Sequence, residues 1–279
     1  MILSRKVLLP TCLSGLLSLS LTACFHDEDA VEEHDIHSDN EISLTLSSAQ
    51  VINSDYATST DTGTANLLFH ESEGELTGSI TLSGEEPGAV HVHVGYAGQT
   101  GVKLITLEKS DTDSTLWEIP EAQANLIDTS TLEAGGYYLN AHLANDQTLR
   151  AQITTDHIAV RVAALEPHSG VTTTGKGFVG VTVNTETHEV TAYVSISDLE
   201  DNSGVHLHVE NADETNSQKI SLDDISVNTD KTSYKTPDGS TLEADAMENI
   251  ESARWYINVH NATTGNGELK GSLAAISHH

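Results

Sequence analysis

The sequence is poor in cysteine, in aromatic residues and in basic side chains. Its two cysteines, Cys12 and Cys24, both lie near the N-terminus, so the chain beyond them cannot contain a disulfide. Aromatic residues make up only 4% of the chain, so any core must rest mainly on Val, Leu and Ile. Lys and Arg total 12 against 42 Asp and Glu, which gives a net charge of −30. This charge excludes a general affinity for nucleic acid and disfavours an electrostatic hold on anionic membranes.

The chain also lacks the short motifs of the common enzyme classes. It has no Gly-x-Ser-x-Gly, no phosphate-binding loop and no dinucleotide-binding fingerprint. No residue that could act as a general base lies at the spacing of a known catalytic motif from the histidines described below. We therefore expect a protein without catalytic activity.

The N-terminus has the pattern of an export signal, residues 1–23. Arg5 and Lys6 precede a largely apolar run, residues 7–21, that is too short for a spanning helix. The run ends in Leu-Thr-Ala-Cys, which resembles the lipobox of bacterial lipoproteins and implies cleavage before Cys24 and acylation of that cysteine. Such a protein would be held on a membrane by its lipid. Phe25 stands where many inner-membrane lipoproteins have Asp, which favours the outer membrane, on its periplasmic or surface face.

Residues 24–41 form an acidic stretch that also contains three histidines. A segment of this composition cannot bury enough apolar area to fold, so we expect a disordered tether. Acidic tracts that contain histidine also gather cations weakly, which is the alternative function for this segment.

One pattern occurs twice in the rest of the chain. Residues 90–94 read Val-His-Val-His-Val and residues 205–209 read Val-His-Leu-His-Val, and both alternate apolar and polar residues as half-buried strands do. Asn-x-His follows each motif, at residues 140–142 and 258–260. The offset between the copies is 115 residues at the first motif and 118 at the final histidine. The spacing indicates a duplicated unit.

Short β-type runs separated by turn residues fill both copies, and no long helical period appears. We therefore predict an all-β chain with two tandem antiparallel β-sandwich or barrel domains of the immunoglobulin-like kind. The first domain would span residues 42–155 and the second residues 156–279, after the signal peptide and the tether.

Several blocks carry a family resemblance. In the first copy they are Leu-Ser-Ser-Ala-Gln (46–50), Val-His-Val-His-Val-Gly-Tyr-Ala-Gly (90–98), Trp-Glu-Ile-Pro (117–120) and Tyr-Leu-Asn-Ala-His (138–142). In the second copy they are residues 205–208, 256–260 and 267–271. Their order resembles the signature blocks of the CHRD domain, named after chordin. The second copy departs from the pattern at residues 164–168 and 210–214, and the first at residues 146–150.

The resemblance implies a fold more than a function. Chordin binds secreted growth factors, whereas the CHRD domains of bacterial exported proteins have mostly undefined roles. We therefore expect a non-catalytic binding module of the cell envelope, with an envelope protein or a glycan as its partner. A structural spacer without a ligand is a further alternative.

The histidines of the two copies offer a second function. Residues i and i+2 of a strand are about 6.6 Å apart on one face, so two imidazoles at that spacing can converge on one ion. The first interpretation is that the histidines are structural residues of the sheet face. The alternative function is a three-histidine copper or zinc site in each domain, in which Asn140 and Asn258 would orient a ligand ring. The candidate ligands are His91, His93 and His142 in the first copy and His206, His208 and His260 in the second.

Overall fold

The computed structural model describes residues 40–52, 57–199, 202–210, 217–227, 232–248, 254–261 and 267–276. The predicted signal peptide, Cys24 and the tether up to residue 39 lie outside the described residues. None of the helices in the described ranges has the length and apolar character needed to cross a membrane.

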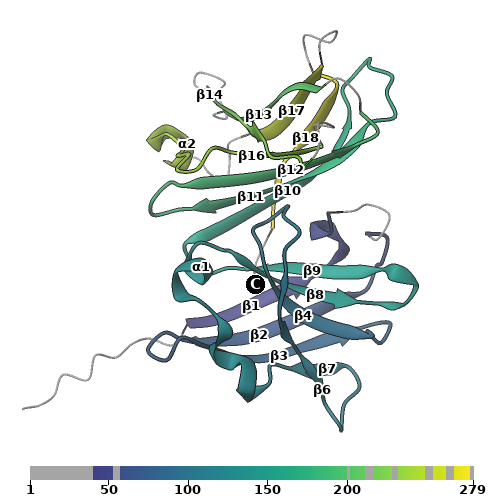
Figure 1. The fold of residues 1–279 in the computed structure, drawn as a ribbon, viewed down its shortest axis with the longest axis vertical. Coiled ribbons are helices and arrows are strands. Elements are labelled where there is room, and N and C mark those ends of the chain that lie inside the picture. The colour runs from purple at the N-terminus through teal and green to yellow at the C-terminus, as the bar shows by residue number, and fades with distance from the viewer. Residues whose placement is uncertain are drawn as a thin grey trace, which may run out of the picture. The chain divides into compact units, whose positions relative to one another are not determined.

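The first domain is a pair of antiparallel sheets (Figure 1). One sheet has the order β1-β2-β3-β7-β6, with bounds Asn40–Leu46, Thr62–His70, Glu75–Ser83, Leu116–Glu118 and Glu108–Lys109. The other has the order β5-β4-β8-β9, with bounds Lys103–Thr106, Ala89–Val94, Tyr137–His142 and Thr148–Ile153. Short helices connect the strands: η1 (Ser48–Gln50), η3 (Glu121–Leu126), α1 (Thr129–Glu133) and η4 (Ala144–Asp146).

The second domain repeats this strand order. The run β10-β11-β12-β16-β15 corresponds to β1-β2-β3-β7-β6, and β14-β13-β17-β18 corresponds to β5-β4-β8-β9. The first run has bounds Ile158–Pro167, Lys176–Asn184, Val190–Ser197, Ser233–Lys235 and Asp223–Asp224. The second has bounds Ser217–Ser221, Asn202–Glu210, Arg254–Asn261 and Leu269–Ser272, and β19 (Ala274–Ala275) and α2 (Ala244–Glu248) complete the domain. The all-β fold and the duplication are thus confirmed.

Backbone hydrogen bonds close one edge of each pair of sheets. In the first domain the backbone N–H groups of Ser47 and Arg150 donate to each other's carbonyl, at 3.1 and 3.0 Å. In the second domain β10 pairs with β18 at Glu166 and Pro167. Each domain is therefore an almost closed, flattened barrel, in which few strand edges remain unpaired.

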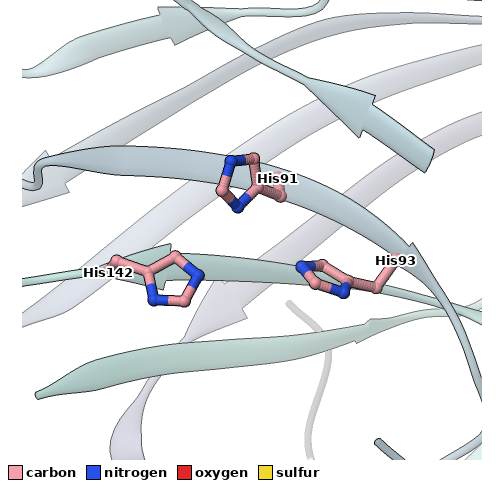
Figure 2. A group of neighbouring side chains, drawn as sticks. All are labelled: His91, His93 and His142. Atoms are coloured by element: carbon pink, nitrogen blue, oxygen red, sulfur yellow. The ribbon is translucent and has the colours of Figure 1, made fainter. Parts of the chain in front are cut away.

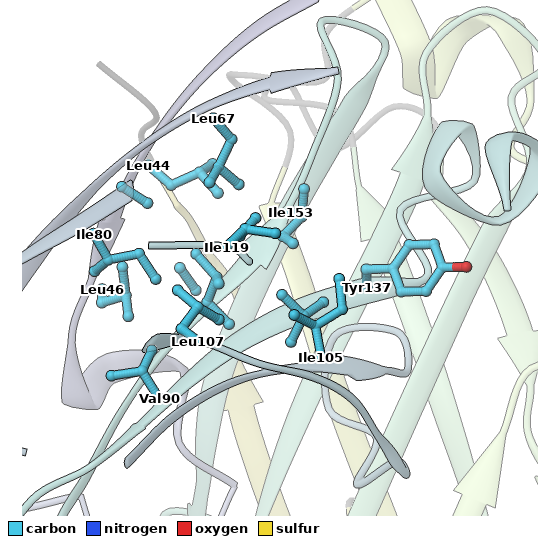
Figure 3. Close-up of a cluster of buried hydrophobic side chains, with 14 of the residues drawn as sticks. Leu44, Leu46, Leu67, Ile80, Val90, Ile105, Leu107, Ile119, Tyr137 and Ile153 are labelled. Atoms are coloured by element: carbon cyan, nitrogen blue, oxygen red, sulfur yellow. The ribbon is translucent and has the colours of Figure 1, made fainter. Parts of the chain in front are cut away.

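The first core lies between the two sheets and consists mainly of aliphatic side chains. In β1 every second residue from Ile42 is buried, as the period of a half-buried strand requires. Each such side chain contributes about 1.5–3 kcal/mol to folding, so aliphatic residues suffice where aromatic residues are few. Figure 3 shows part of this core: Leu44, Leu46, Leu67, Ile80, Val90, Ile105, Leu107, Ile119, Tyr137 and Ile153.

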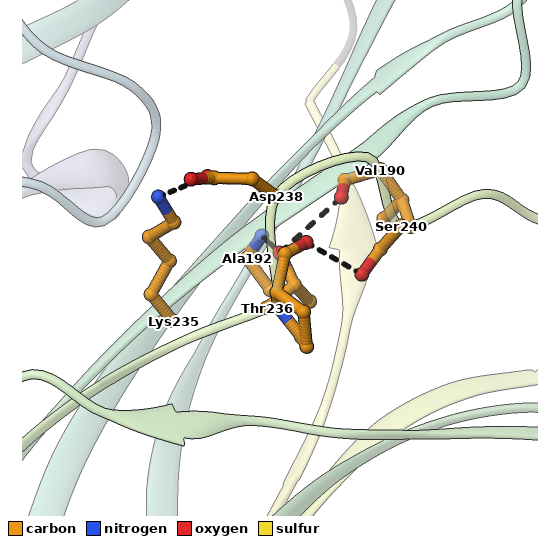
Figure 4. Close-up of polar contacts among 7 residues, drawn as sticks. Val190, Ala192, Lys235, Thr236, Asp238 and Ser240 are labelled. Atoms are coloured by element: carbon orange, nitrogen blue, oxygen red, sulfur yellow. Dashed lines mark hydrogen bonds and ion pairs between the residues drawn. The ribbon is translucent and has the colours of Figure 1, made fainter.

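A buried threonine joins the short strand β16 to β12 in the second domain. The Oγ1 atom of Thr236 accepts from the backbone N–H of Ala192 at 3.1 Å and donates to the carbonyl of Val190 at 3.2 Å (Figure 4). Beside it, the surface pair Lys235–Asp238 spans the following turn. The hydroxyl group of Thr236 thus supplies hydrogen bonds to β12 directly after the end of the three-residue strand β16.

Candidate metal centre

The pairing of β4 with β8 determines where the first set of histidines lies. Val90 and Val92 are fully buried, so the alternate residues His91 and His93 occupy the outer face of the sheet. In the register of the two strands, Ala89 lies opposite His142. This register brings the third imidazole to the same face as the other two.

The three imidazoles form one group. Figure 2 shows the rings of His91, His93 and His142 turned toward one another. Each residue offers one ligand atom, and these atoms lie within 4.8 Å of one another. The ring centroid of His91 is 5.7 Å from that of His93 and 5.3 Å from that of His142. Nitrogen ligands of a tetrahedral zinc ion lie roughly 3.3 Å apart, so binding requires side-chain movements of about 1 Å.

The hydrogen bond of His93 determines which of its nitrogen atoms can bind a metal. Its Nδ1 atom lies 3.1 Å from the carbonyl oxygen of Gly101. Because a carbonyl only accepts, Nδ1 carries the hydrogen, and the lone pair of the neutral ring is on Nε2. That Nε2 atom and the Nδ1 atom of His91 are both buried and have no hydrogen-bond partner within the described ranges. Two shielded nitrogen atoms are therefore available to a ligand.

All three histidines favour the neutral form. Burial, followed by the charge of Lys103 and then by the other two imidazoles, lowers the pKa of His91 to about 4. Burial also lowers the pKa of His93, against the opposing effect of its hydrogen bond to Gly101. Burial and then Lys103 lower the pKa of His142. Neutral imidazole is the form that binds a metal, so protons compete weakly at neutral pH.

Asn140 contacts one of the candidate ligands, His142. Its Nδ2 atom lies 3.3 Å from Nε2 of His142. A metal bound at Nε2 would displace this amide. A metal bound at Nδ1 would keep the contact, with Nε2–H donating to the amide oxygen after the amide group is flipped.

The second set of histidines has the same strand positions, but its ligand atoms do not come as close together. The ring of His206 lies 6.0 Å from that of His208 and 4.9 Å from that of His260. Burial, followed by the charge of His206, lowers the pKa of His208 to about 4. Among the described His, Cys, Asp and Glu residues, the first-domain histidines are the one group of three whose ligand atoms meet the 4.8 Å distance. Asn258 leaves Oδ1 buried without a partner in the described part of the chain.

Each domain also contains a stack of three side chains that sequence reasoning missed. In the first, the ring of Tyr138 stacks on His93 at 4.9 Å, and the guanidinium of Arg150 lies 3.5 Å from the tyrosine ring centroid. In the second, Tyr256 stacks on His208 at 4.7 Å, and Lys270 lies 3.9 Å from the tyrosine ring centroid. The sequence feature that could have revealed these stacks is a basic residue directly after leucine near the end of each copy, at residues 150 and 270.

Comparison with known proteins identifies the family of this duplicated barrel. A family model of the CHRD domain matches residues 42–153 and, a second time, residues 159–273. The chain belongs to the CHRD domain family. The resemblance seen in the sequence is thus confirmed for both copies. No curated protein and no solved structure matches the chain.

Proposed function

We propose that the tandem CHRD domains form a non-catalytic binding module and that the first domain binds a transition-metal ion, copper or zinc. The observation that carries the proposal is the group formed by His91, His93 and His142, whose ligand atoms lie within 4.8 Å of one another. Neutral imidazole suits both metals, and three histidines leave one coordination position for water or a further ligand.

A cation that binds at this site has few protons to displace. The rings are already neutral at pH 7, because burial lowers the pKa of each histidine. The net charge of −30 also attracts cations to the molecule as a whole. Lys103 opposes this attraction locally, since its charge is among those that lower the pKa of His91. The site therefore suits a metal that binds nitrogen strongly rather than one that depends on charge alone.

Calorimetric titration of the purified protein with Zn²⁺ and Cu²⁺, after treatment with a chelator, tests the proposal. We expect one tightly bound ion per chain. Replacement of His91, His93 and His142 by glutamine should abolish this binding, because the ligand nitrogens are lost. The matched control variant has the second set, His206, His208 and His260, replaced by glutamine. It should retain metal binding. Absence of binding, or an equal loss in both variants, would contradict the proposal.

We also propose that the protein is exported and held at the cell envelope by a lipid on Cys24, at the outer membrane. The support is the sequence of residues 1–25, namely a basic start, an apolar run and the lipobox-like tetrapeptide. More than one acyl chain would make this attachment stable. In this setting the module would meet envelope proteins and glycans, the partner classes expected from the sequence.

A further inference from the structure

Strand β5, at the edge of the sheet β5-β4-β8-β9, places two hydrogen-bond donors beside the candidate metal centre. Lys103 lies directly opposite His93 in the pairing of β4 with β5, and Thr106 lies opposite His91. Side chains of directly opposed residues stand on the same face of a sheet. Lys103 and Thr106 are both exposed. An ammonium group and a hydroxyl group therefore border the imidazoles on the outer face.

Neither donor is engaged by the protein itself. The side chains of Lys103 and Thr106 make no hydrogen bond or ion pair with any residue that the structure describes, and residues 57–199 are described without a gap. Lys109, in contrast, pairs with Glu86. The ammonium group of Lys103 and the hydroxyl group of Thr106 are therefore available to a molecule from solution.

A metal ion at this centre would bring positive charge that the surrounding described residues do not neutralise. Neutral imidazoles leave a divalent ion with its full charge. Burial is the main cause of the lowered pKa of each of the three histidines, and the charge of Lys103 contributes to the lowering in all three. No described Asp or Glu acts on any of them. Like charges repel more strongly in a partly buried site than in water, so an anion in the remaining coordination position is favoured.

The same pair of donors recurs in the second domain. Lys219 lies opposite His208 and Ser221 lies opposite His206 in the pairing of β13 with β14. The donors of β5 are three residues apart in the sequence and those of β14 two, and a shift of register between β4 and β5 compensates for the difference. Both domains thus place an ammonium group beside one histidine of the His-x-His motif and a hydroxyl group beside the other.

The second domain has a carboxylate of its own next to this arrangement. Burial lowers the pKa of His208 most, and the charge of Glu210 opposes that lowering. Gly95 stands at the corresponding position of the first domain, two residues after His93. A carboxylate at the first centre would therefore have to come from another molecule.

We propose that the metal centre of the first domain takes a small monocarboxylate as its fourth ligand, with one oxygen atom on the metal and the other held by Lys103 and Thr106. This inference rests on the metal site proposed above. Carboxylate oxygen is a common ligand of zinc, and its bond to an ammonium group is a charge-assisted hydrogen bond. A singly charged anion is favoured, because the net charge of −30 repels a doubly charged one more strongly.

Calorimetric titration of the zinc-loaded protein with sodium acetate tests the proposal. The zinc isotherm is recorded first, in acetate-free buffer, and acetate is then added at neutral pH and constant ionic strength. Acetamide and sodium chloride are the neutral and the halide controls. We expect saturable binding of acetate to the zinc-loaded protein and none to the metal-free protein.

The two proposals can fail separately in this experiment. Zinc binding without saturable acetate binding would overturn the carboxylate ligand and leave the metal site standing, whereas absence of zinc binding would overturn both. Saturable binding of chloride with the same affinity as acetate would also overturn the carboxylate ligand, because chloride has no second oxygen atom for the donors of β5.

Variants of the two donors connect acetate binding to β5. For Lys103→Gln we expect the Kd of acetate to rise about two- to fivefold, since an exposed charge interaction contributes modestly. For Lys103→Gln/Thr106→Val we expect at least about a tenfold rise, because a hydrogen bond to a charged group is lost as well. Lys109→Gln is the matched control and should leave this Kd unchanged. An unchanged Kd in the double variant, or in both single variants if the double variant does not fold, would contradict the proposal.

The metal ion and the carboxylate should respond to Lys103 in opposite directions. In acetate-free buffer, Lys103→Gln should bind Zn²⁺ more tightly than the unmodified protein does, because a repelling charge is gone, while its zinc-loaded form binds acetate less tightly. A general loss of structure would weaken the binding of both. Tighter binding of acetate by Lys103→Gln, or weaker binding of both ligands by a variant whose circular dichroism is unchanged, would contradict the proposal.

Discussion

At the scale of single residues, the candidate metal centre depends on imidazoles kept neutral by their surroundings. Partial burial lowers the pKa of all three, and that of His91 falls to about 4. The carbonyl of Gly101 fixes the ring of His93 so that Nε2 has the lone pair. Two neighbouring charges act against a bound cation. Arg150 acts on His93, and Lys103, which lies opposite His93 in the pairing of β4 with β5, acts on all three ligands. The charge that all three share is that of Lys103.

Removal of that charge should strengthen metal binding. For Lys103→Gln we expect an affinity for Zn²⁺ about two- to fivefold higher, since an exposed charge interaction is worth roughly 0.2–1 kcal/mol. Calorimetric titration at low ionic strength, where the charge is least screened, measures the change. Lys109→Gln is the matched control and should bind as the unmodified protein does. Equal or weaker binding by Lys103→Gln would contradict this account of the charge.

At the scale of elements, β9 and the loop of residues 95–101 support the ligand His93. Arg150 of β9 is only 4% exposed and donates to the carbonyls of Tyr96 and Gln99 in that loop. The loop ends at Gly101, whose N–H donates to the hydroxyl of Tyr138 at 3.1 Å and whose carbonyl accepts from His93. The arginine therefore positions a metal ligand that it does not touch.

The variant Arg150→Met tests this positioning. It leaves two loop carbonyls without their donor, so we expect the free energy of unfolding to fall by about 3 kcal/mol in urea denaturation. Metal affinity should fall as well, because second-shell contacts of this kind typically contribute 10- to 100-fold. Lys270→Met removes the corresponding cation of the second domain and should leave zinc binding unchanged. A folded Arg150→Met protein with full metal affinity would show that the loop does not position His93.

The elements themselves were largely predictable from the sequence. Alternation of apolar and polar residues identified β4, and the block of residues 138–142 lies within β8. The two-residue strands β6 and β15 were missed because a run that short has no measurable period. Strand β10 extends to Pro167, where its last two residues pair with β18, a contact that the sequence pattern does not reveal.

The site was predictable only in part. The period of two placed His91 and His93 on one face, but the approach of His142 depends on strand register, which alternation alone does not determine. Lys103 and Arg150 reach the same face from strands that are separate in the sequence. The two copies have the same motif in the sequence, yet the group of ligand atoms within 4.8 Å is the one in the first domain.

At the scale of the whole molecule, duplication has kept one strand order while the two outer faces have diverged. The first face brings the ligand atoms of three histidines within 4.8 Å of one another, whereas the three histidines of the second face do not meet this distance. A net charge of −30 favours the approach of metal ions and opposes that of anions.

The central claim is that His91, His93 and His142 bind one metal ion, and NMR of the imidazole nitrogens tests it most directly. Spectra of ¹⁵N-labelled protein, assigned with single His→Gln variants, would be recorded before and after one equivalent of Zn²⁺. Before zinc we expect His93 as the Nδ1–H tautomer, because Nδ1 faces the carbonyl of Gly101. After zinc, these three of the 15 histidines should shift to metal-bound positions. Unchanged resonances from the three, or shifts confined to other histidines, would contradict the account.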